Sequence, residues 1–172
     1  IREECRGKRE TLLQAAIQVF AKKGYIRTQI EEVAKAAKVA KGTVYLYFKS
    51  KDELFVQAMQ EAVHSQIQDV KKKVEEYKTA YDRIQNFFHL NLDYFVSHPD
   101  QTKFLINEFH QSQDFRKKNP TFNPYGEYIQ YINSLIESAI AEKSIKSVDS
   151  IALTYIIIGT LEQIIASWLM NP

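Results

Sequence analysis

The sequence is poor in the residues that cross-link a chain or interrupt its secondary structure. It has one cysteine among 172 residues, which excludes an internal disulfide and favours a reducing compartment. Five glycines and four prolines leave few turn signals, and this favours helices over a many-stranded fold. The N-terminus is charged where a signal peptide would be apolar, and Glu162 and Gln163 interrupt the longest apolar stretch, residues 153–170. These absences favour a cytoplasmic all-α protein.

The small net charge of +2 hides an uneven distribution along the chain. Residues 1–52 carry 12 Lys and Arg against 6 Asp and Glu, whereas residues 53–172 carry 11 against 15. A basic front segment on an acidic body indicates a polyanion that contacts one end of the protein. Chance variation of surface charge is the alternative explanation.

Apolar residues recur at helical spacing along most of the chain. Gly24 is expected to stop the first helix, and Thr28 with Glu31 forms a capping-box pattern at the start of the second. The predicted helices cover residues 8–23, 28–37, 41–48, 51–78, 81–96, 100–114, 128–142 and 148–170, with a loop at 115–126.

The front of the chain has the layout of a helix-turn-helix unit, with two short helices, a tight turn and a third short helix. At about 100° per residue, Val44 and Phe48 of the third helix point into a small core, whereas Tyr47 faces away and Tyr45 lies at the border. Exposed tyrosine and threonine hydroxyls beside lysines suit contact with DNA phosphates. The alternative is that these lysines are simply solvated.

The segment "VAKGTVYLYFKSKDEL" (Val39–Leu54), preceded by "GYIRTQIEEVAKAAK" (Gly24–Lys38), resembles the signature of TetR-type transcriptional regulators over about residues 10–55. The resemblance implies a DNA-binding domain at 1–50 and a helical ligand-binding and dimerisation domain at 51–172. It implies phosphate contacts by Thr28, Tyr47 and Lys51, base or phosphate contacts by Lys41, Gly42, Thr43 and Tyr45, and contributions from Gln29 and Lys8.

Two residues depart from that family pattern. Ala40 stands where a serine often caps the recognition helix, and the loss of such a cap typically costs about 1 kcal/mol. Glu31 stands where a basic residue is frequent. Both departures concern the sequence of the operator and leave the expectation of DNA binding intact.

The body of the chain is dense in aromatic residues, since the whole sequence holds ten Phe and ten Tyr. We expect a large apolar cavity with a few polar anchors, although core packing explains each single ring equally well. The predicted pocket residues are Phe87, Phe88, Asn91, Tyr94, Phe104, Glu108, Phe109, Tyr128, Tyr131 and Tyr155.

The last predicted helix is apolar nearly all round, which indicates burial on two sides. One side is expected to form a homodimer interface through Leu153, Ile157, Leu161, Ile164 and Trp168. The family resemblance implies one further helix beyond this point. Within the family, "NEFHQS" (Asn107–Ser112) and "GTLEQIIASWLMN" (Gly159–Asn171) resemble regulators of fatty-acid degradation, whose inducers are long-chain acyl-CoA thioesters.

The sequence therefore predicts a dimeric repressor that binds a palindromic DNA operator and is released by an acyl-CoA or a fatty acid, without a cofactor. One alternative is a regulator of an efflux gene that responds to aromatic or drug-like ligands. Another is a helical interaction module that does not bind DNA. An enzyme is not supported, because the four histidines show no metal-ligand spacing and the chain has no nucleophile elbow or glycine-rich phosphate loop.

Overall fold

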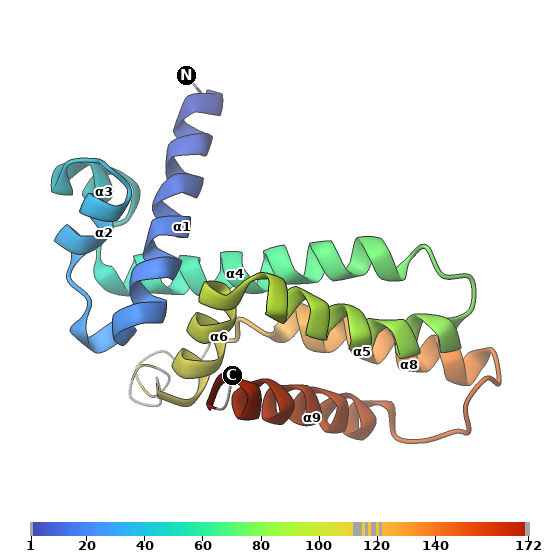
Figure 1. The fold of residues 1–172 in the computed structure, drawn as a ribbon. Coiled ribbons are helices and arrows are strands. Elements are labelled where there is room, and N and C mark those ends of the chain that lie inside the picture. The colour runs from blue at the N-terminus through green and yellow to red at the C-terminus, as the bar shows by residue number, and fades with distance from the viewer. Residues whose placement is uncertain (1, 112–114, 116, 118–119, 121, 171–172) are drawn as a thin grey trace. The chain divides into compact units, whose positions relative to one another are not determined.

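Figure 1 shows the computed structural model of the chain, which describes residues 2–111, 115, 117, 120 and 122–170. The fold is all-helical. Its helices are α1 (Arg2–Arg27), α2 (Ile30–Ala36), α3 (Lys41–Tyr47), α4 (Lys51–Val74), α5 (Ala80–Ser97), α6 (Pro99–Gln111), α8 (Gly126–Ala141) and α9 (Ser150–Met170). Contacts divide the chain into unit 1, residues 1–62 and 99–124, and unit 2, residues 63–98 and 125–172. The predicted domain boundary at residue 50 remains a prediction.

Unit 1 is built around α1, which packs against α6 and α2, while α2 packs against α3. The apolar stripe that the sequence predicts on α1 is buried, and so are the inner residues of α2 and α3. These side chains close a small core that holds the two short helices α2 and α3 against α1, because helices of seven residues are not stable without such packing. The core residues are Leu13, Ala16, Ile17, Phe20, Ile30, Val33, Ala34, Val44 and Phe48.

The chain turns sharply between α1 and α2. Gly24 has φ 76° and ψ 160°, so the helical path breaks there although hydrogen bonding continues to Arg27. A positive φ is readily available to glycine and is costly for other residues. The predicted stop at Gly24 is therefore confirmed as a break inside α1, and the bounds of the helix extend three residues beyond it.

A cluster of aromatic rings fills the part of unit 1 where α1, α4 and α6 meet. Phe104 of α6 lies 5.7 Å from Phe20 and 5.8 Å from Phe55, measured between ring centroids. Phe55 in turn packs edge-on to Phe20 at 5.4 Å and touches Tyr25 at 4.7 Å. The sequence predicts Phe104 in the ligand pocket of the body. The structure places it instead in the core of unit 1, against Phe20 and Phe55.

Unit 2 consists of the second half of α4 with α5, α8 and α9. Helix α8 packs against both α5 and α9 and runs antiparallel to them (Figure 1). The buried faces of α5 and α8 are apolar, with residues at the helical spacing that the sequence predicts. The buried side chains include Val70, Val74, Phe87, Phe95, Ile132, Leu135, Ile136, Leu161 and Ile165.

Three polar side chains form a hydrogen-bonded group inside the core of unit 2. The Oδ1 atom of Asn91 accepts from Gln66 Nε2 at 3.0 Å and from the hydroxyl of Tyr128 at 2.9 Å, and all three residues are buried. The Nδ2 atom of Asn91 donates to the carbonyl of Phe87 at 2.8 Å. Burial raises the pKa of Tyr128 far above its usual value, so the phenol is a neutral donor. One acceptor atom on α5 thus joins α4 to α8.

Helix α9 has one buried face and one exposed face. Leu161 and Ile165 are buried, as is Thr154, whose hydroxyl donates to the carbonyl of Ser150 at 2.8 Å. The opposite stripe is exposed and largely apolar: Ile151, Ala152, Tyr155, Ile156, Gly159, Thr160, Gln163, Ile164, Ser167 and Trp168. By length and composition α9 would also pass as a membrane span, a property that core helices of soluble proteins share.

The buried polar group predicts a large effect of replacing Asn91 by leucine. The N91L variant leaves the donors of Gln66 and Tyr128 buried without their acceptor, and each unsatisfied group typically costs about 1–3 kcal/mol. We expect the free energy of unfolding, measured by urea denaturation followed by circular dichroism, to fall by about 2–4 kcal/mol. Within the described residues, the side chain of Asn86 on the same helix donates to the carbonyl of Asp82 and makes no other hydrogen bond, so N86L is the matched control. Equal losses in the two variants would contradict the role assigned to Asn91.

Candidate nucleic-acid interface

The start of α2 is capped one residue later than the sequence predicts. The backbone N–H of Gln29, the N-cap residue, donates to Glu32 Oε2 at 3.1 Å. The sequence pattern predicts Thr28 and Glu31 as this capping box, and that prediction is wrong. The segment Thr-Gln-Ile-Glu-Glu holds two adjacent glutamates, so either register satisfies the pattern of an acidic residue three positions after the cap. In the structure Glu32 caps α2, and Glu31 is left on the surface.

A tight turn joins α2 to α3. Lys38 has a positive φ of 56°, and the N–H groups of Lys38 and Val39 close the turn on the carbonyls of Lys35 and Ala34 at 3.1 and 2.9 Å. The N-cap of α3 is Ala40, whose side chain makes no capping hydrogen bond, as the sequence predicts. The packing of α3 on the core must therefore offset the missing cap.

Helix α3 divides its side chains between the core of unit 1 and the surface. Val44 and Phe48 are fully buried, which confirms the predicted inner face. Tyr45 is 45% exposed and Leu46 is 83% exposed, whereas Tyr47 is partly buried with its ring 6.5 Å from that of Phe48. In chain order, the surface side of α3 consists of Lys41, Gly42, Thr43, Tyr45, Leu46 and Tyr47.

Gly42 leaves open space at the first turn of α3. It is exposed, and a Cβ atom added there would meet no other atom within 4 Å. Its φ is not positive, so the backbone at this position does not require glycine. The structure of the chain itself therefore gives no packing or backbone reason for glycine here.

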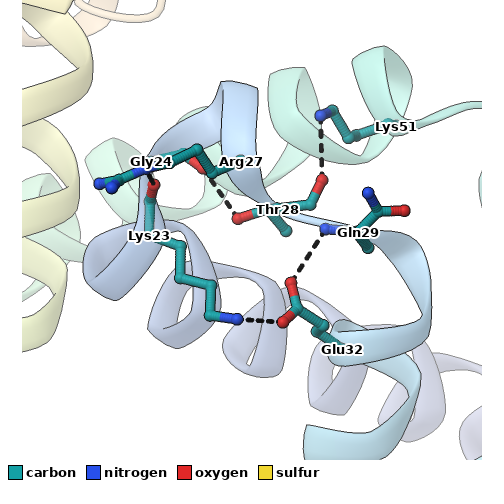
Figure 2. Close-up of polar contacts among 7 residues, drawn as sticks. All are labelled: Lys23, Gly24, Arg27, Thr28, Gln29, Glu32 and Lys51. Carbon is teal, nitrogen blue, oxygen red and sulfur yellow. Dashed lines mark hydrogen bonds and ion pairs between the residues drawn. The ribbon is translucent and has the colours of Figure 1, made fainter.

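Lys51, the first residue of α4, holds the turn between α1 and α2 (Figure 2). Its Nζ atom donates to the carbonyl of Thr28 at 3.0 Å and to the carbonyl of Ile26 at 3.2 Å. The same ammonium lies 4.5 Å from the ring centroid of Tyr25, whose hydroxyl donates to Asp52. The family resemblance implies a phosphate contact by Lys51. In the structure two of its three donors are already used within the chain.

The side chain of Thr28 is buried rather than presented to solvent. Its residue exposure is 2%, and its hydroxyl donates to the carbonyl of Gly24 at 2.8 Å (Figure 2). A side-chain contact with phosphate requires an exposed hydroxyl, and the hydroxyl of Thr28 does not meet that condition. Gln29, next to it, is exposed and keeps its place among the predicted contacts.

The charged groups of this surface are paired in part. Lys41 Nζ lies 2.5 Å from Glu31 Oε1 and 5.9 Å from the ring centroid of Tyr45. The hydrogen bond from Lys41 lowers the pKa of Glu31, and the same bond raises the pKa of Lys41. Both groups are therefore charged at neutral pH. Lys23 pairs with Glu32 on the far side of the cap.

Several predicted pocket residues gather in unit 2. Phe87 lies 5.9 Å from Tyr128 and 6.1 Å from Tyr131 between ring centroids, and Asn91 bonds to Tyr128 as described. Tyr94 is buried beside Ser65 of α4, with 3.5 Å between the hydroxyl oxygens.

Other predicted residues lie elsewhere. Phe88 is partly buried on α5, and Tyr155 is 57% exposed on the outer face of α9, away from this group. The side chains of Glu108 and Phe109 lie outside the described part of the chain. Among the described residues no three His, Cys, Asp or Glu side chains gather in a metal-binding arrangement.

Sequence reasoning missed three features of the site. The pairing of Glu31 with Lys41 joins two helices and has no short-range signature, although Glu31 departs from the family pattern. The capping role of Glu32 was missed because the adjacent Glu31 fits the same sequence pattern. The carbonyl contacts of Lys51 span more than twenty residues and depend on the turn at Gly24.

The front of the chain matches the profile of a known protein family. Residues 12–58 match the profile of the family "Bacterial regulatory proteins, tetR family". These residues run from within α1 into α4 and include all of α2 and α3. The match therefore covers the helix-turn-helix unit and not the body.

Similar proteins extend over the rest of the chain. A fatty acid metabolism regulator protein of Bacillus subtilis is 24% identical over 168 residues, which cover 96% of this chain and 86% of that protein. The transcriptional repressor NicS of Pseudomonas putida is 27% identical over 154 residues, covering 89% and 73%. The crystal structure of the regulator FadR from Bacillus subtilis in complex with stearoyl-CoA has a TM-score of 0.84 and 25% identity, covering 94% and 87%.

The open space at Gly42 predicts opposite effects on stability and on DNA binding when alanine replaces it. Alanine in a helix is favoured over glycine by about 0.5–1 kcal/mol, so G42A should unfold at the same or a slightly higher temperature. We expect its affinity for duplex DNA, measured by fluorescence anisotropy, to fall about tenfold, the effect of about 1.4 kcal/mol of steric cost at the groove. Gly7 of α1 also has open space around it, so G7A is the control. Unchanged DNA binding by G42A would show that the start of α3 does not approach DNA.

Proposed function

Because the chain is a DNA-binding transcriptional repressor of the TetR family, we propose that it binds a palindromic operator as a homodimer and that a long-chain acyl-CoA or fatty acid in unit 2 releases it. The observation that carries the proposal is the division of α3 into a buried face and an exposed face of lysine, glycine, threonine and tyrosine. A regulator of this kind acts in the cytoplasm, where the DNA is.

The proposed DNA contacts come from the exposed side of α3 and from the start of α2. Lys41 is placed to donate to a guanine edge or a phosphate, and Thr43, Tyr45 and Tyr47 offer hydroxyl donors. Gln29 has an exposed amide at the N-terminal end of α2. The third donor of Lys51 remains available for a phosphate beyond its two carbonyl contacts.

A second copy of the chain is the proposed partner of the exposed face of α9. This stripe follows the helix for its whole length, and Ile156 in it is 63% exposed. Gly159 lies near its middle, and a Cβ atom added there would meet nothing within 4 Å, which permits close approach of a partner helix. Of the five predicted interface residues, Ile164 and Trp168 belong to this stripe and Leu153 and Ile157 flank it. Leu161 is buried within the chain and is left out.

A dimer also fits the reading of DNA. A helix-turn-helix unit reads one half-site, and a two-fold dimer places two such units about 34–36 Å apart on a palindrome. An exposed apolar stripe along a helix of 21 residues exceeds what a monomer usually leaves in water. Both considerations favour a second copy over an unrelated partner.

The ligand site is proposed in unit 2, between the second half of α4, α5 and α8. Its apolar wall consists of Phe87 and Tyr94, and its polar group is Asn91 with Tyr128. In the described part of the chain, the buried hydroxyl of Tyr131 has no hydrogen-bond partner. An unsatisfied buried donor calls for an explanation, and a polar group of a ligand supplies one.

Tyr131 is suited to donate rather than to carry charge. Burial, helped by the negative charge of Glu75, raises its pKa to about 12. The phenol is therefore neutral at physiological pH and offers its proton to an acceptor such as a thioester carbonyl or a carboxylate. The FadR structure from Bacillus subtilis, 25% identical to this chain and bound to stearoyl-CoA, supports a long acyl chain as the apolar part of the ligand.

Release is proposed to act through α4, which contributes residues to both units. The division between the units falls after Ala62, inside this helix. Gln66, on one side of that point, belongs to the polar group of unit 2, and Lys51, on the other side, holds the turn before α2. A ligand that binds more tightly when α4 is shifted therefore favours a state in which the DNA-binding helices are displaced.

The unpaired hydroxyl of Tyr131 predicts that the Y131F variant loses part of its ligand response and keeps its DNA binding. An operator is first selected from a random duplex library with the wild-type protein over a salt series. Phenylalanine removes an unsatisfied donor, so the unfolding free energy and the operator affinity should stay the same or rise. The palmitoyl-CoA concentration for half release should rise about fivefold, the loss of about 1 kcal/mol from one hydrogen bond.

The control for this experiment is Y81F, which removes a hydroxyl from an exposed tyrosine of α5. Free CoA and palmitate are tested beside palmitoyl-CoA to separate the parts of the ligand. A wild-type response to none of the three would contradict the proposed ligand class. An unchanged response of Y131F would contradict the proposed position of the ligand-binding site.

The exposed stripe of α9 predicts that I156E produces a folded monomer. Each dimer would bury two new carboxylates, and burial of an unpaired charge costs several kcal/mol, so the dimer dissociation constant should rise about 100-fold or more. Sedimentation velocity measures the association state, and circular dichroism checks the fold. Q85E adds the same charge at an exposed residue of α5 as the control. A dimer that persists in I156E, or wild-type protein that is monomeric and bound to lipid vesicles, would contradict the assignment of this face.

A further inference from the structure

Glu31 places a negative charge on a surface that otherwise suits a polyanion. It lies in the first turn of α2, and its Oε1 atom is 2.5 Å from the Nζ atom of Lys41, the first residue of α3. The side chains of both residues are about half exposed, at 54% and 51%. Neither is needed to cap its helix, because Glu32 caps α2 and Ala40 is the N-cap of α3. The ion pair between Glu31 and Lys41 is therefore not what caps either helix.

The pair lies among the proposed DNA contacts. Lys41 also lies over the ring of Tyr45, at 5.9 Å from its centroid, so its ammonium is held between a carboxylate and an aromatic face. Gly42, directly after it, leaves the first turn of α3 open. A partner that approaches this turn meets the carboxylate and the ammonium together.

A carboxylate at this place weakens binding to DNA in general. It repels phosphates, and it forms an ion pair with Lys41, which would otherwise neutralise one phosphate and release its counterion. Non-specific affinity depends on those phosphate contacts. The pair therefore lowers affinity for any duplex that offers it only phosphates.

The same two groups match base edges in the major groove. Lysine donates to O6 and N7 of guanine, and a glutamate accepts from the N4 amino group of cytosine. The bond to Lys41 uses Oε1 of Glu31, and a carboxylate has about four acceptor positions, so it can accept a further bond beside the donor of Lys41. A carboxylate next to an ammonium thus favours a hydrogen-bond donor and a hydrogen-bond acceptor on neighbouring base edges. It disfavours the phosphate backbone, which offers acceptors only.

Resting on the proposed function, we propose that Glu31 determines the specificity of this regulator. Paired with Lys41, it discriminates against non-specific DNA and accepts a hydrogen bond from a cytosine amino group beside the guanine that Lys41 contacts. Specificity is a difference of affinities, and a repulsive group that only the correct site compensates increases that difference.

The test compares full-length wild-type protein with E31Q, K41Q and the double variant. Each protein selects from a random duplex library, and its affinity for the selected operator and for an unrelated duplex is then measured over a salt series. D69N, which removes a carboxylate paired to Lys73 at 2.8 Å in unit 2, is the matched control. E31A repeats the experiment with a different side chain, and thermal unfolding confirms that each variant is folded.

We expect E31Q to bind the unrelated duplex about fivefold to tenfold more tightly at 0.1 M salt, because one lysine becomes available for phosphate. The slope of log affinity against log salt should steepen by about 0.9 for that duplex. The selected sequence should lose its base preference at one position in each half-site. Adding E31Q to K41Q should leave the slope unchanged, because the lysine is already absent.

Unchanged selection and an unchanged salt slope in E31Q would overturn the inference. An equal loss of affinity for all duplexes would also overturn it, since it would assign Glu31 a purely structural role. If D69N reproduces the effect of E31Q, the effect belongs to net charge and the inference fails. If the wild-type protein selects no sequence at all, the proposed function itself fails, and that outcome is distinct from the other three.

Discussion

The turn between α1 and α2 is the feature on which the geometry of the DNA-binding helices depends. Gly24 breaks the helical path, and the carbonyls that follow have lost their partners within the helix. Lys51 supplies donors to two of them, at Ile26 and Thr28. The ring of Tyr25 supports the ammonium, and Tyr25 bonds to Asp52. Two consecutive residues of α4 thus fix the point where α2 begins, and α3 follows from α2 through a turn of four residues.

Much of the helical framework is predictable because it depends on local periodicity. The inner face of α3 follows from the four-residue spacing of Val44 and Phe48, and the uncapped start of α3 follows from Ala40. The cap of α2 is less predictable, because threonine is a better N-cap than glutamine and both registers offer a glutamate. Packing decides the register here: burial of Ile30 and Val33 fixes α2, and Gln29 is left at the cap. Long-range contacts such as that of Lys51 leave no signal at sequence spacing.

The aromatic residues show a second limit of the sequence. Helical spacing tells which ring faces inward, but not which core it enters. Phe104 and Phe87 both lie on amphipathic helices, yet Phe104 packs on Phe20 and Phe55 in unit 1, and Phe87 packs on Tyr128 in unit 2. Tyr155 lies on a helix with two apolar faces, of which only one is covered by the chain itself. Tyr155 belongs to the other face and is exposed. Which face a chain covers is a property of the tertiary structure.

The energetics of release favour a ligand with a long apolar chain. Reversing a two-state population from 1:99 to 99:1 requires about 5.5 kcal/mol of differential binding. A single hydrogen bond, such as one to Tyr131, contributes about 0.5–1.5 kcal/mol and falls short of that. A buried methylene contributes about 0.8 kcal/mol, so about seven methylenes that are buried in one state and not in the other are sufficient. A long acyl chain reaches that number even if only some of its methylenes are buried differently in the two states. The polar group then orients the ligand and does not supply the driving force.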